Sequence, residues 1–388
     1  MAKNIVFCAD GTWNGPGEAD ADDNAAPATN VFKLFLNLEG RDSPDTIALA
    51  KEQERWFNAP DGSVAQIAKY IHGVGDSNNF LVKLLGGAMG AGLITRIVRG
   101  YTFISRNYCS GDRIFITGFS RGAYTARALA GLISNQGLLD ATKVDLSDKT
   151  KAYRLGAGAW YAFRKSVASK NWLDHLADLI VDMPLFFTQP PSADLRISTV
   201  DIQAVAVWDT VGALGIPAYT LQATRLDPFQ FADLKLSDVV RNGLHAIAVD
   251  EQRGDFTPTL WDQDGRITQA LFPGAHADVG GGYPISNGES ALSDCSLTWM
   301  TDHLAKLGVN FVAPPALGSP DAAGVAHQPW ADCPWTLLER KPRQLPPGLE
   351  MSASLTDRLR AAVVRASPIC PPGPYLPQNL KQYPTGMV

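Results

Sequence analysis

Residues 112–133 read DRIFITGFSRGAYTARALAGLI, and this stretch decides the fold class. The β-branched and aromatic residues at 112–117 predict a strand, whereas 123–133 is rich in helix-forming residues. Ser120 lies between them with a glycine two residues away on each side, where a Cβ would collide with the neighbouring strand or helix. Such a turn lifts the serine hydroxyl above the sheet edge, at the positive end of the helix. The pattern therefore predicts that Ser120 is a nucleophile.

A glycine–serine–glycine pattern also arises by chance in a chain with 35 glycines, so an acid and a histidine must support it. In α/β-hydrolases these follow the serine, first the acid and then the histidine. The apolar run 202–208 predicts a strand buried on both faces, and Asp209 follows it directly. His276 follows the next predicted strand in a glycine-rich loop. We therefore expect an α/β-hydrolase-like fold, a mostly parallel central sheet flanked by helices, with Ser120, Asp209 and His276 as catalytic triad.

Other histidines and acids fit these roles less well. A helix expected at 236–250 contains His245 on an apolar face, and the remaining histidines lie in a helix, in an insertion, before the serine or in the tail: His303, His175, His72 and His327. Asp250 follows the expected helix. Asp278 is too close to His276 in sequence to orient it easily, so we expect Asp278 to order the loop instead.

The oxyanion formed during acyl transfer needs two backbone donors. The N–H of Arg121, next after the nucleophile, is the expected first donor. The second is expected from the loop after the first strand, where Gly11 and Thr12 are the candidates because glycine permits a close approach. Asp10 is expected to hold this loop by hydrogen bonds, since a carboxylate aimed at an oxyanion would oppose the reaction.

The composition fits an enzyme with a large core. The chain has 388 residues, of which 45% are hydrophobic and 19% charged, and its net charge of −5 argues against nucleic-acid binding. The cysteines form no Cys-x-x-Cys pair and are expected to be buried free thiols, without a zinc site or a disulfide framework: Cys8, Cys109, Cys295, Cys333 and Cys370. No metal and no cofactor is expected. Neither a signal peptide nor a membrane-crossing run is recognisable, so we expect a cytoplasmic protein as synthesised.

The segments divide into a catalytic domain at 1–312 and an irregular, proline-rich C-terminal extension at 313–388. Helices are expected at 93–108 and 292–307, and the Asp-Gly pair at 264–265 predicts a hairpin between 259–261 and 266–272. Two aromatic-rich segments, 151–195 and 217–231, follow the serine turn and the acid. They form either a lid with a wall for an acyl chain or a helical subdomain that buries its own aromatic side chains.

Six ordered segments also carry a resemblance to a known family: 7–14, 73–75, 111–127, 207–215, 245–253 and 272–283. Over about residues 3–310, the chain resembles the α/β-hydrolase family of the bacterial type VI secretion phospholipase effectors, formerly a domain of unknown function. The resemblance implies the Ser120, Asp209 and His276 triad and ester hydrolysis, with phospholipid as the best-known substrate class.

The residues and the resemblance together predict a serine esterase or lipase that cleaves lipid or phospholipid acyl esters through an acyl-enzyme. A small-ester or polyester esterase and a non-catalytic binding module of the same fold remain alternatives. Expected partners are the ester substrate and, transiently, a membrane surface. If the protein is an effector, a secretion apparatus or an immunity protein joins them, with export by a non-classical bacterial secretion system.

Overall fold

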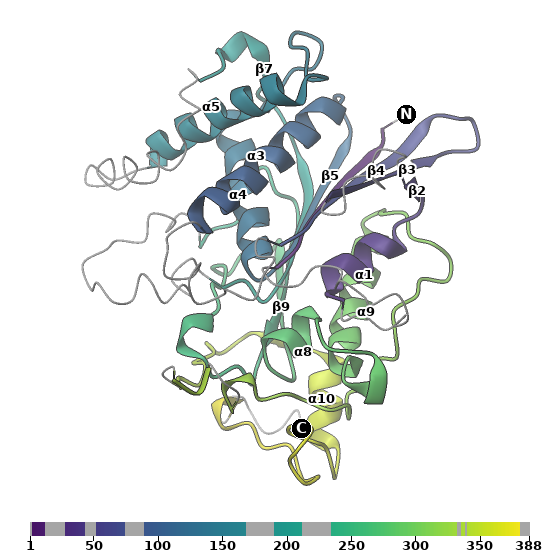
Figure 1. Ribbon diagram of the computed structural model, residues 1–388, viewed down its shortest axis with the longest axis vertical. Helices are drawn as coiled ribbons and strands as arrows, with labels where there is room; N and C mark the ends of the chain where they lie inside the picture. The colour runs from purple at the N-terminus through teal and green to yellow at the C-terminus, as the bar shows by residue number, and fades with distance from the viewer. Residues whose placement is uncertain are drawn as a thin grey trace.

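The computed structural model describes residues 2–11, 28–42, 52–73, 89–167, 190–211, 234–331, 335–337 and 340–380. A nine-stranded sheet runs through this part of the chain in the order β11-β10-β9-β8-β5-β1-β4-β3-β2 (Figure 1). Its strands are β1 (Asn4–Ala9), β2 (Arg41–Asp42), β3 (Glu52–Asn58), β4 (Val64–Ile71), β5 (Arg113–Phe119), β8 (Ile202–Trp208), β9 (Gly243–Ala248), β10 (Ile267–Phe272) and β11 (Glu350–Met351). A separate two-stranded sheet pairs β6 (Leu138–Leu139) with β7 (Arg196–Ile197).

The strands from β11 to β4 in this order are parallel, and only β3 and β2 at the far edge run antiparallel. In the centre, Ile5 of β1 lies opposite Ile67 of β4 on one side and Ile114 of β5 on the other. Parallel strands bring their carboxyl ends to one edge, which is where ligands bind in open α/β sheets. This mostly parallel sheet flanked by helices confirms the expected fold class.

Helices cover both faces of the sheet (Figure 1). One face carries α3 (Met89–Asn107) and α4 (Arg121–Gln136), on which α5 (Lys149–Val167) packs, and the other carries α1 (Asn30–Asn37), α8 (His276–Gly280) and α9 (Ala291–Lys306). Side chains of β1 alternate between the two cores, because successive residues of a strand point to opposite faces: Ile5 and Phe7 on the α3 side, Val6 and Cys8 on the α9 side. The helices expected at 93–108 and 292–307 are thereby confirmed.

The C-terminal segment adds structure of its own to the sheet. It forms β11, which pairs with β10, and α10 (Ala353–Arg360), which is capped by the Ser352 hydroxyl. Together they bury a third apolar cluster made of Ile247, Val249, Leu271, Leu345, Leu355 and Leu380. The extension is therefore more regular than its proline content indicates, while the division of the chain at residue 312 stays a prediction.

Short 3-10 turns connect the remaining described segments: Ala193–Leu195, Gly254–Phe256, Ser286–Gly288, Pro329–Ala331, Trp335–Leu337 and Gln378–Leu380.

The helix expected at 236–250 is wrong, because its apolar part forms β9. This strand is buried between β8 and β10, and all six of its residues are buried. A strand covered on both faces has a continuous apolar sequence, which periodicity cannot distinguish from a buried helix. His245 consequently lies on a strand and not on a helix.

The hairpin expected around the Asp-Gly pair is also wrong. Residues 266–272 do contain a strand, β10, but it pairs in parallel with β9 and β11. The segment before the turn forms no strand, and the Trp261 N–H donates instead to the Gln269 side chain (2.8 Å). The turn is nevertheless present, since the Ile267 N–H donates to the Asp264 carbonyl.

The described part of the first aromatic segment packs against the body of the fold. Trp160 and Phe163 of α5 are buried, with ring centroids 5.6 Å apart, and they belong to the core cluster shared with α3 and α4. Residues 168–189 and all of 217–231 lie outside the described residues. The lid and acyl-wall interpretation therefore stays a prediction.

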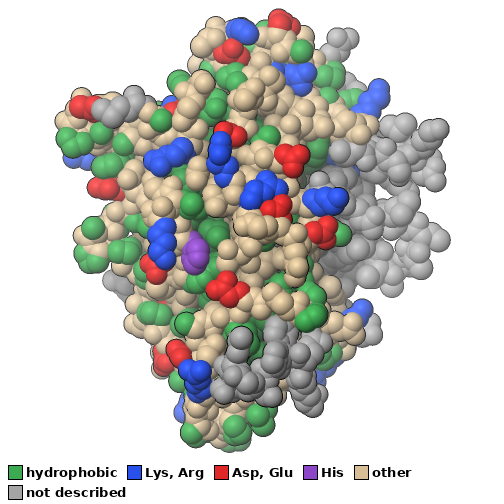
Figure 2. Space-filling model, turned by 180° about the vertical axis from the view of Figure 1, so that it is seen from behind, with side chains coloured by type: hydrophobic (Ala, Val, Ile, Leu, Met, Phe, Trp, Pro, Cys, Tyr) green, Lys and Arg blue, Asp and Glu red, His purple; other side chains and the backbone are tan. Residues whose placement is uncertain are grey.

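Lysine, arginine, aspartate and glutamate side chains are interspersed over the face seen from behind in Figure 2. Mixed charges of this kind produce little long-range attraction for a polyanion. Among the helices of the described ranges, none is both long and apolar enough to span a bilayer.

The turn between β5 and α4 is sterically closed to side chains larger than hydrogen at two positions. A Cβ at Gly118 would lie 2.2 Å from the Gly122 carbonyl oxygen, and a Cβ at Gly122 would lie 2.0 Å from the Ala9 oxygen. Between them, Ser120 adopts φ 57° and ψ −120°, a strained backbone conformation. The contact with Ala9 fixes the serine turn against the end of β1.

This geometry makes the two glycines a test of the fold. Gly118→Ala and Gly122→Ala should each lower the free energy of unfolding by about 3 kcal/mol, because the clashes are with backbone atoms that cannot rotate away. Urea unfolding followed by circular dichroism measures the change. Gly265→Ala is the matched control, since nothing lies within 4 Å of its Cβ position, and it should change stability by less than about 0.5 kcal/mol. Equal midpoints for the three variants would contradict the clash.

Candidate active site

Ser120 lies at the carboxyl edge of the sheet, directly after β5. Its side chain is buried and makes no capping bond to α4, and its backbone N–H donates to the Trp208 carbonyl of β8 (3.1 Å). The hydroxyl is therefore at the first turn of α4, where helix N–H groups and the helix dipole favour a developing negative charge. The same backbone bond ties the serine turn to the residue that precedes Asp209.

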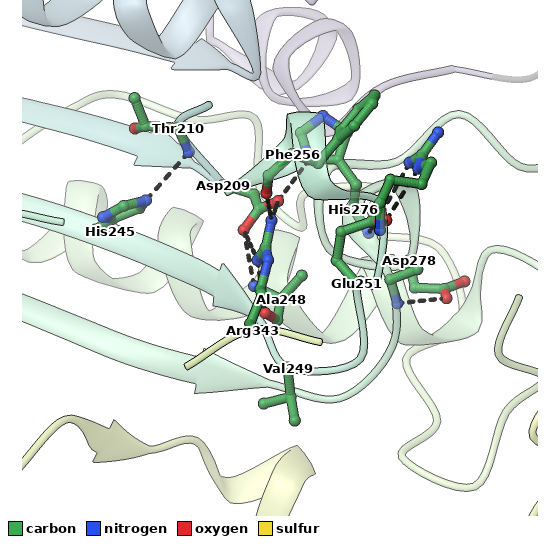
Figure 3. A network of polar contacts seen from close by, with 12 residues as sticks. Asp209, Thr210, His245, Ala248, Val249, Glu251, Phe256, His276, Asp278 and Arg343 are labelled. Atoms are coloured by element: carbon green, nitrogen blue, oxygen red, sulfur yellow. Dashed lines mark hydrogen bonds and ion pairs between the residues drawn. The ribbon is translucent and has the colours of Figure 1, made fainter. Parts of the chain in front are cut away.

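Asp209 and His276 form a direct pair at this edge (Figure 3). Asp209 follows β8 with a positive φ of 39°, and His276 is the first residue of α8 rather than part of an extended loop. His276 Nδ1 donates to Asp209 Oδ2 at 2.5 Å, and both side chains are buried. With the proton on Nδ1, Nε2 is the basic nitrogen of the ring.

Aromatic packing connects this pair to the serine turn. The ring of Phe119, the residue before Ser120, lies on the His276 imidazole with centroids 4.5 Å apart. Gly280, at the end of α8, allows this approach, because a Cβ there would lie 1.9 Å from the Phe119 ring. Phe256 contacts the imidazole edge-on at 4.9 Å. The structure thus brings Asp209 and His276 together and places Ser120 one residue from a ring that contacts His276.

Four donors surround the buried carboxylate of Asp209. Oδ1 accepts from the Ala248 N–H (2.9 Å) and from Arg343 Nη1 (2.6 Å), while Oδ2 accepts from Arg343 Nη2 (2.8 Å) and from His276. Burial opposes ionisation, but the Arg343 guanidinium and then the bond to His276 hold the pKa of Asp209 well below its usual range. The carboxylate is therefore ionised at neutral pH.

Arg343 was not identified from the sequence. It lies in the proline-rich tail between Pro342 and Gln344, and no local pattern distinguishes it from the other arginines there. Only the folded chain brings it to Asp209.

Glu251 and Arg253 form a second buried ion pair beside His276, also without an expected role. Glu251 accepts from Arg253 Nε (2.9 Å) and Nη2 (2.8 Å), and its Oε2 accepts from the backbone N–H of His276 (3.2 Å). The guanidinium lies 3.7 Å from the ring centroid of Phe256 and 4.7 Å from that of Trp335. The pair fixes the first residue of α8 and the aromatic wall next to it.

Burial lowers the pKa of His276 below its ordinary value, even though the bond to Asp209 opposes this shift. Arg253 lowers the pKa further, and Glu251 raises it. The imidazole is therefore neutral at neutral pH, which is the form that accepts a proton.

Asp278 lies within α8 and orders the approach to His276. Its Oδ2 accepts from the N–H groups of Ala275 (2.8 Å) and His327 (3.0 Å), and its Oδ1 pairs with His327 Nδ1 (2.6 Å). His327 also contacts Glu289 (3.3 Å). Burial disfavours the charged ring, but the bonds to Asp278 and Glu289 raise the pKa of His327 above its ordinary value. Asp278 follows His276 by two residues in α8, so this second aspartate–histidine pair holds the same short helix.

Asp10, at the end of β1, accepts from Tyr70 Oη (2.5 Å), Thr29 Oγ1 (2.7 Å) and the N–H of Gly11 (2.6 Å). Burial raises its pKa to about 6 against these bonds. The Gly11 N–H is thus engaged with a carboxylate in this structure, while Thr12 lies outside the described residues.

Arg121 begins α4, and burial lowers the pKa of its side chain to about 9. This shift concerns the side chain and says nothing about the backbone N–H. The expected oxyanion donors, Arg121 and the 10–12 loop, stay predictions.

His245 supports the backbone after Asp209 from the neighbouring strand. Its Nε2 accepts from the Thr210 N–H (3.2 Å), and its Nδ1 faces Gln269 Oε1 (3.4 Å). Complete burial lowers the pKa of His245 to about 3. The ring is consequently neutral and structural, in spite of its place near the site.

The cysteines differ in part from expectation. Cys8 is a buried thiol whose pKa burial raises to about 12, but Cys109 is exposed, while Cys295 and Cys370 are half-buried and Cys333 lies outside the described ranges. No group of three or more histidine, cysteine, aspartate or glutamate side chains in the described residues could hold a metal ion.

The low pKa of His245 makes stability depend on pH. Unfolded histidine binds a proton below about pH 6.5, whereas folded His245 stays neutral down to a pKa of about 3, so stability falls as pH drops through this window. His245→Gln keeps an acceptor for Thr210 and removes the titration. Its unfolding free energy should fall less steeply, by up to roughly 1.4 kcal/mol per pH unit. Urea unfolding of both proteins at pH 7, 6 and 5 measures this, and identical slopes would contradict it.

Comparisons with known proteins agree with the resemblance seen in the sequence. The family model described as "T6SS, Phospholipase effector Tle1-like, catalytic domain" matches residues 3–303. The uncharacterized protein YEL023C of Saccharomyces cerevisiae is 29% identical over 256 residues, which is 66% of this chain and 32% of the yeast protein. The chain thus spans about a third of the length of this curated relative.

Two solved structures are similar to this chain. An uncharacterized protein from Pseudomonas aeruginosa has a TM-score of 0.45 at 19% identity, covering 83% of this chain and 49% of that one. The Tle1 effector bound to the VgrG spike from the Type 6 secretion system has a TM-score of 0.40 at 18% identity, covering 74% of this chain and 52% of that one. With the family model matching residues 3–303, the chain belongs to the family of Tle1-like catalytic domains of type VI secretion phospholipase effectors.

Proposed function

We propose that the protein is a serine hydrolase that cleaves carboxylic acyl esters of lipids, and of phospholipids in particular. Ser120 is the nucleophile, His276 the general base and acid, and Asp209 the carboxylate that orients the imidazole. The observation that carries this proposal is the buried 2.5 Å bond between His276 and Asp209, at the sheet edge where the strained serine turn also lies.

The reaction follows from these roles. His276 Nε2 accepts the hydroxyl proton as Ser120 Oγ attacks the acyl carbonyl, and the imidazolium then protonates the departing alcohol. The acyl group remains on Ser120 as an ester. Water, deprotonated by the same nitrogen, attacks this acyl-enzyme, and the fatty acid leaves as Ser120 regains its proton. Asp209 stabilises the imidazolium in both halves of the reaction.

The electrostatics of the described residues support this cycle. The lowered pKa of His276 keeps the base neutral before each attack, and the ionised Asp209 holds the proton on Nδ1. We propose the Arg121 N–H, at the start of α4, as the first oxyanion donor. The Gly11 N–H would first have to exchange its bond to Asp10, so the second donor is proposed from the 10–12 loop without choosing between Gly11 and Thr12.

The lipid class of the substrate, the effector role and their partners are proposals that the family supports, since it is named for type VI secretion phospholipase effectors. They include transient contact with a membrane surface, export by a non-classical secretion system, and a secretion-apparatus or immunity protein as partner. The Tle1 effector bound to the VgrG spike is an example of such an assembly in another protein.

Labelling by a fluorophosphonate tests the nucleophile without knowledge of the substrate. Wild-type protein should be labelled at Ser120, and Ser120→Ala should lose labelling and at least about 10⁴-fold in kcat, because the attacking oxygen is gone. Ser134→Ala, an exposed serine on the same helix, is the matched control and should behave as wild type. Undiminished ester turnover by folded Ser120→Ala would refute the assignment.

The substrate class is tested with p-nitrophenyl esters of two to twelve carbons beside phosphatidylcholine and phosphatidylethanolamine vesicles. We expect kcat/KM to rise with acyl length, since each desolvated methylene contributes about 0.8 kcal/mol, and fatty acid to be released from vesicles. Ser120→Ala provides the blank for both assays. A decline from acetate onward without vesicle hydrolysis would identify a small-ester esterase, and inactivity on every ester would favour a binding module.

A further inference from the structure

We propose that Arg343 is a positioning residue of the active site, supplied by the C-terminal segment to hold the Asp209 carboxylate in the orientation that His276 requires. This residue lies 40 positions beyond the end of the family match at 303. The inference rests on the proposed function for its catalytic consequence, although its structural part does not.

The guanidinium makes four hydrogen bonds within the site (Figure 3). Nη1 donates to Asp209 Oδ1 and to the Ala248 carbonyl, both at 2.6 Å. Nη2 donates to Asp209 Oδ2 (2.8 Å) and to the Phe256 carbonyl (2.7 Å). A planar fork that engages both carboxylate oxygens fixes the rotation of the carboxyl group, which a single bond would not do.

Arg343 is itself held in place by the backbone around it. The Lys341 N–H donates to the Gln252 carbonyl (2.6 Å), and Leu345 is buried in the apolar cluster under α10. The segment is therefore anchored on both sides of Arg343, so the backbone already places the side chain next to Asp209. This preorganisation is what a positioning role requires.

The fork determines which lone pairs remain for the histidine. Oδ1 is occupied by the Ala248 N–H and Arg343 Nη1, so His276 is left with Oδ2. Loss of Arg343 would leave each oxygen with one donor, the Ala248 N–H on Oδ1 and His276 on Oδ2. The buried carboxylate would then have less opposing charge and be held less tightly in its rotation about χ2. The Nδ1 bond, and with it the direction in which Nε2 points, would then vary.

The charge of Arg343 also tunes the base. In the described part of the chain, the charged groups near His276 include Asp209 after β8, Glu251 and Arg253 after β9, Asp278 of α8 with its partner His327, and Arg343 from the tail. Removing the positive charge leaves the negative potential of Asp209 less compensated, which favours the imidazolium. A variant without this charge should therefore raise the pKa of His276, so that at a given pH a larger fraction of the imidazole is protonated and accepts no proton.

A purely structural role, in which Arg343 only anchors the tail to the sheet, predicts something different. Its loss would lower the melting temperature and the amount of folded protein, while the titration of His276 and the kcat of the folded fraction would stay the same. The two roles are thus separated by measurements on folded protein.

The experiment uses the full chain with Arg343→Gln, Arg343→Lys and the matched control Arg340→Gln, a nearby arginine whose side chain bonds to Gln252 at the surface. Nuclear magnetic resonance titration of the His276 ring, assigned with His276→Gln, gives its pKa in each protein. We expect Arg343→Gln to raise this pKa by about 1, Arg343→Lys to raise it less, and Arg340→Gln to leave it unchanged.

Kinetics on the same proteins test positioning. Arg343→Gln should lower kcat about 10- to 100-fold with little change in KM, and the acid limb of its pH–rate profile should move to higher pH. Arg343→Lys keeps the charge but not the fork, so it should also lose kcat while folding normally. It keeps the test open if Arg343→Gln does not fold.

A double-mutant cycle with Asp209→Asn completes the test. If Arg343 acts through Asp209, then Asp209→Asn/Arg343→Gln should be no slower than Asp209→Asn alone, whereas independent losses would multiply. Multiplying losses, or an unchanged His276 titration and kcat in folded Arg343→Gln, would overturn the proposal. Because the titration needs no substrate, a shifted His276 in a protein that hydrolyses no ester would refute the proposed function and leave the positioning of Asp209 standing.

Discussion

The rest of the site depends on one constraint, that the carboxylate of Asp209 is completely buried and must be fully paired. An ion removed from water loses several kcal/mol of solvation unless charge and hydrogen bonds replace it. Here the replacements come from a neighbouring strand, a short helix and the tail: Ala248, His276 and Arg343. Without these partners, the buried charge would destabilise the core. With them, it connects segments that are far apart in the sequence.

A second constraint is steric and acts on the serine turn. The backbone of the turn lies so close to the end of β1 that Gly122 has room only for hydrogen, and the Phe119 ring fills the space that Gly280 leaves open. These contacts set the height of the turn over the sheet and the position of α8 against it. Electrostatics and packing thus both determine the position of the His276 ring. Asp209 binds its edge through Nδ1, and Phe119 packs on its face.

Local chemistry explains which parts were predictable from sequence. The serine turn needs glycines at set positions, and Asp209 follows a short apolar run of strand length that ends at a turn, so both are visible in short stretches. β9 was mistaken for a helix because its continuous apolar sequence carries no period, and its identity is decided by the strands on either side. The strand β3, next to the edge strand β2, was not expected either, because its charged and polar residues at 52–55 resemble a loop. The pairs of Arg343 and of His327 join residues far apart in sequence, which no local pattern encodes.

The position of Arg343 has a consequence for how the catalytic unit is defined. The match to the family model ends at residue 303, yet the carboxylate of Asp209 obtains its cationic partner from residue 343. In the proposed triad a serine, an acid and a histidine supply the reacting groups. The cation that pairs with the acid and engages both of its oxygens comes from outside that boundary. In a relative whose tail lacks such an arginine, the same carboxylate would need another cation or additional N–H donors, or it would need to be less buried. The burial of the acid and the presence of its cation should therefore change together.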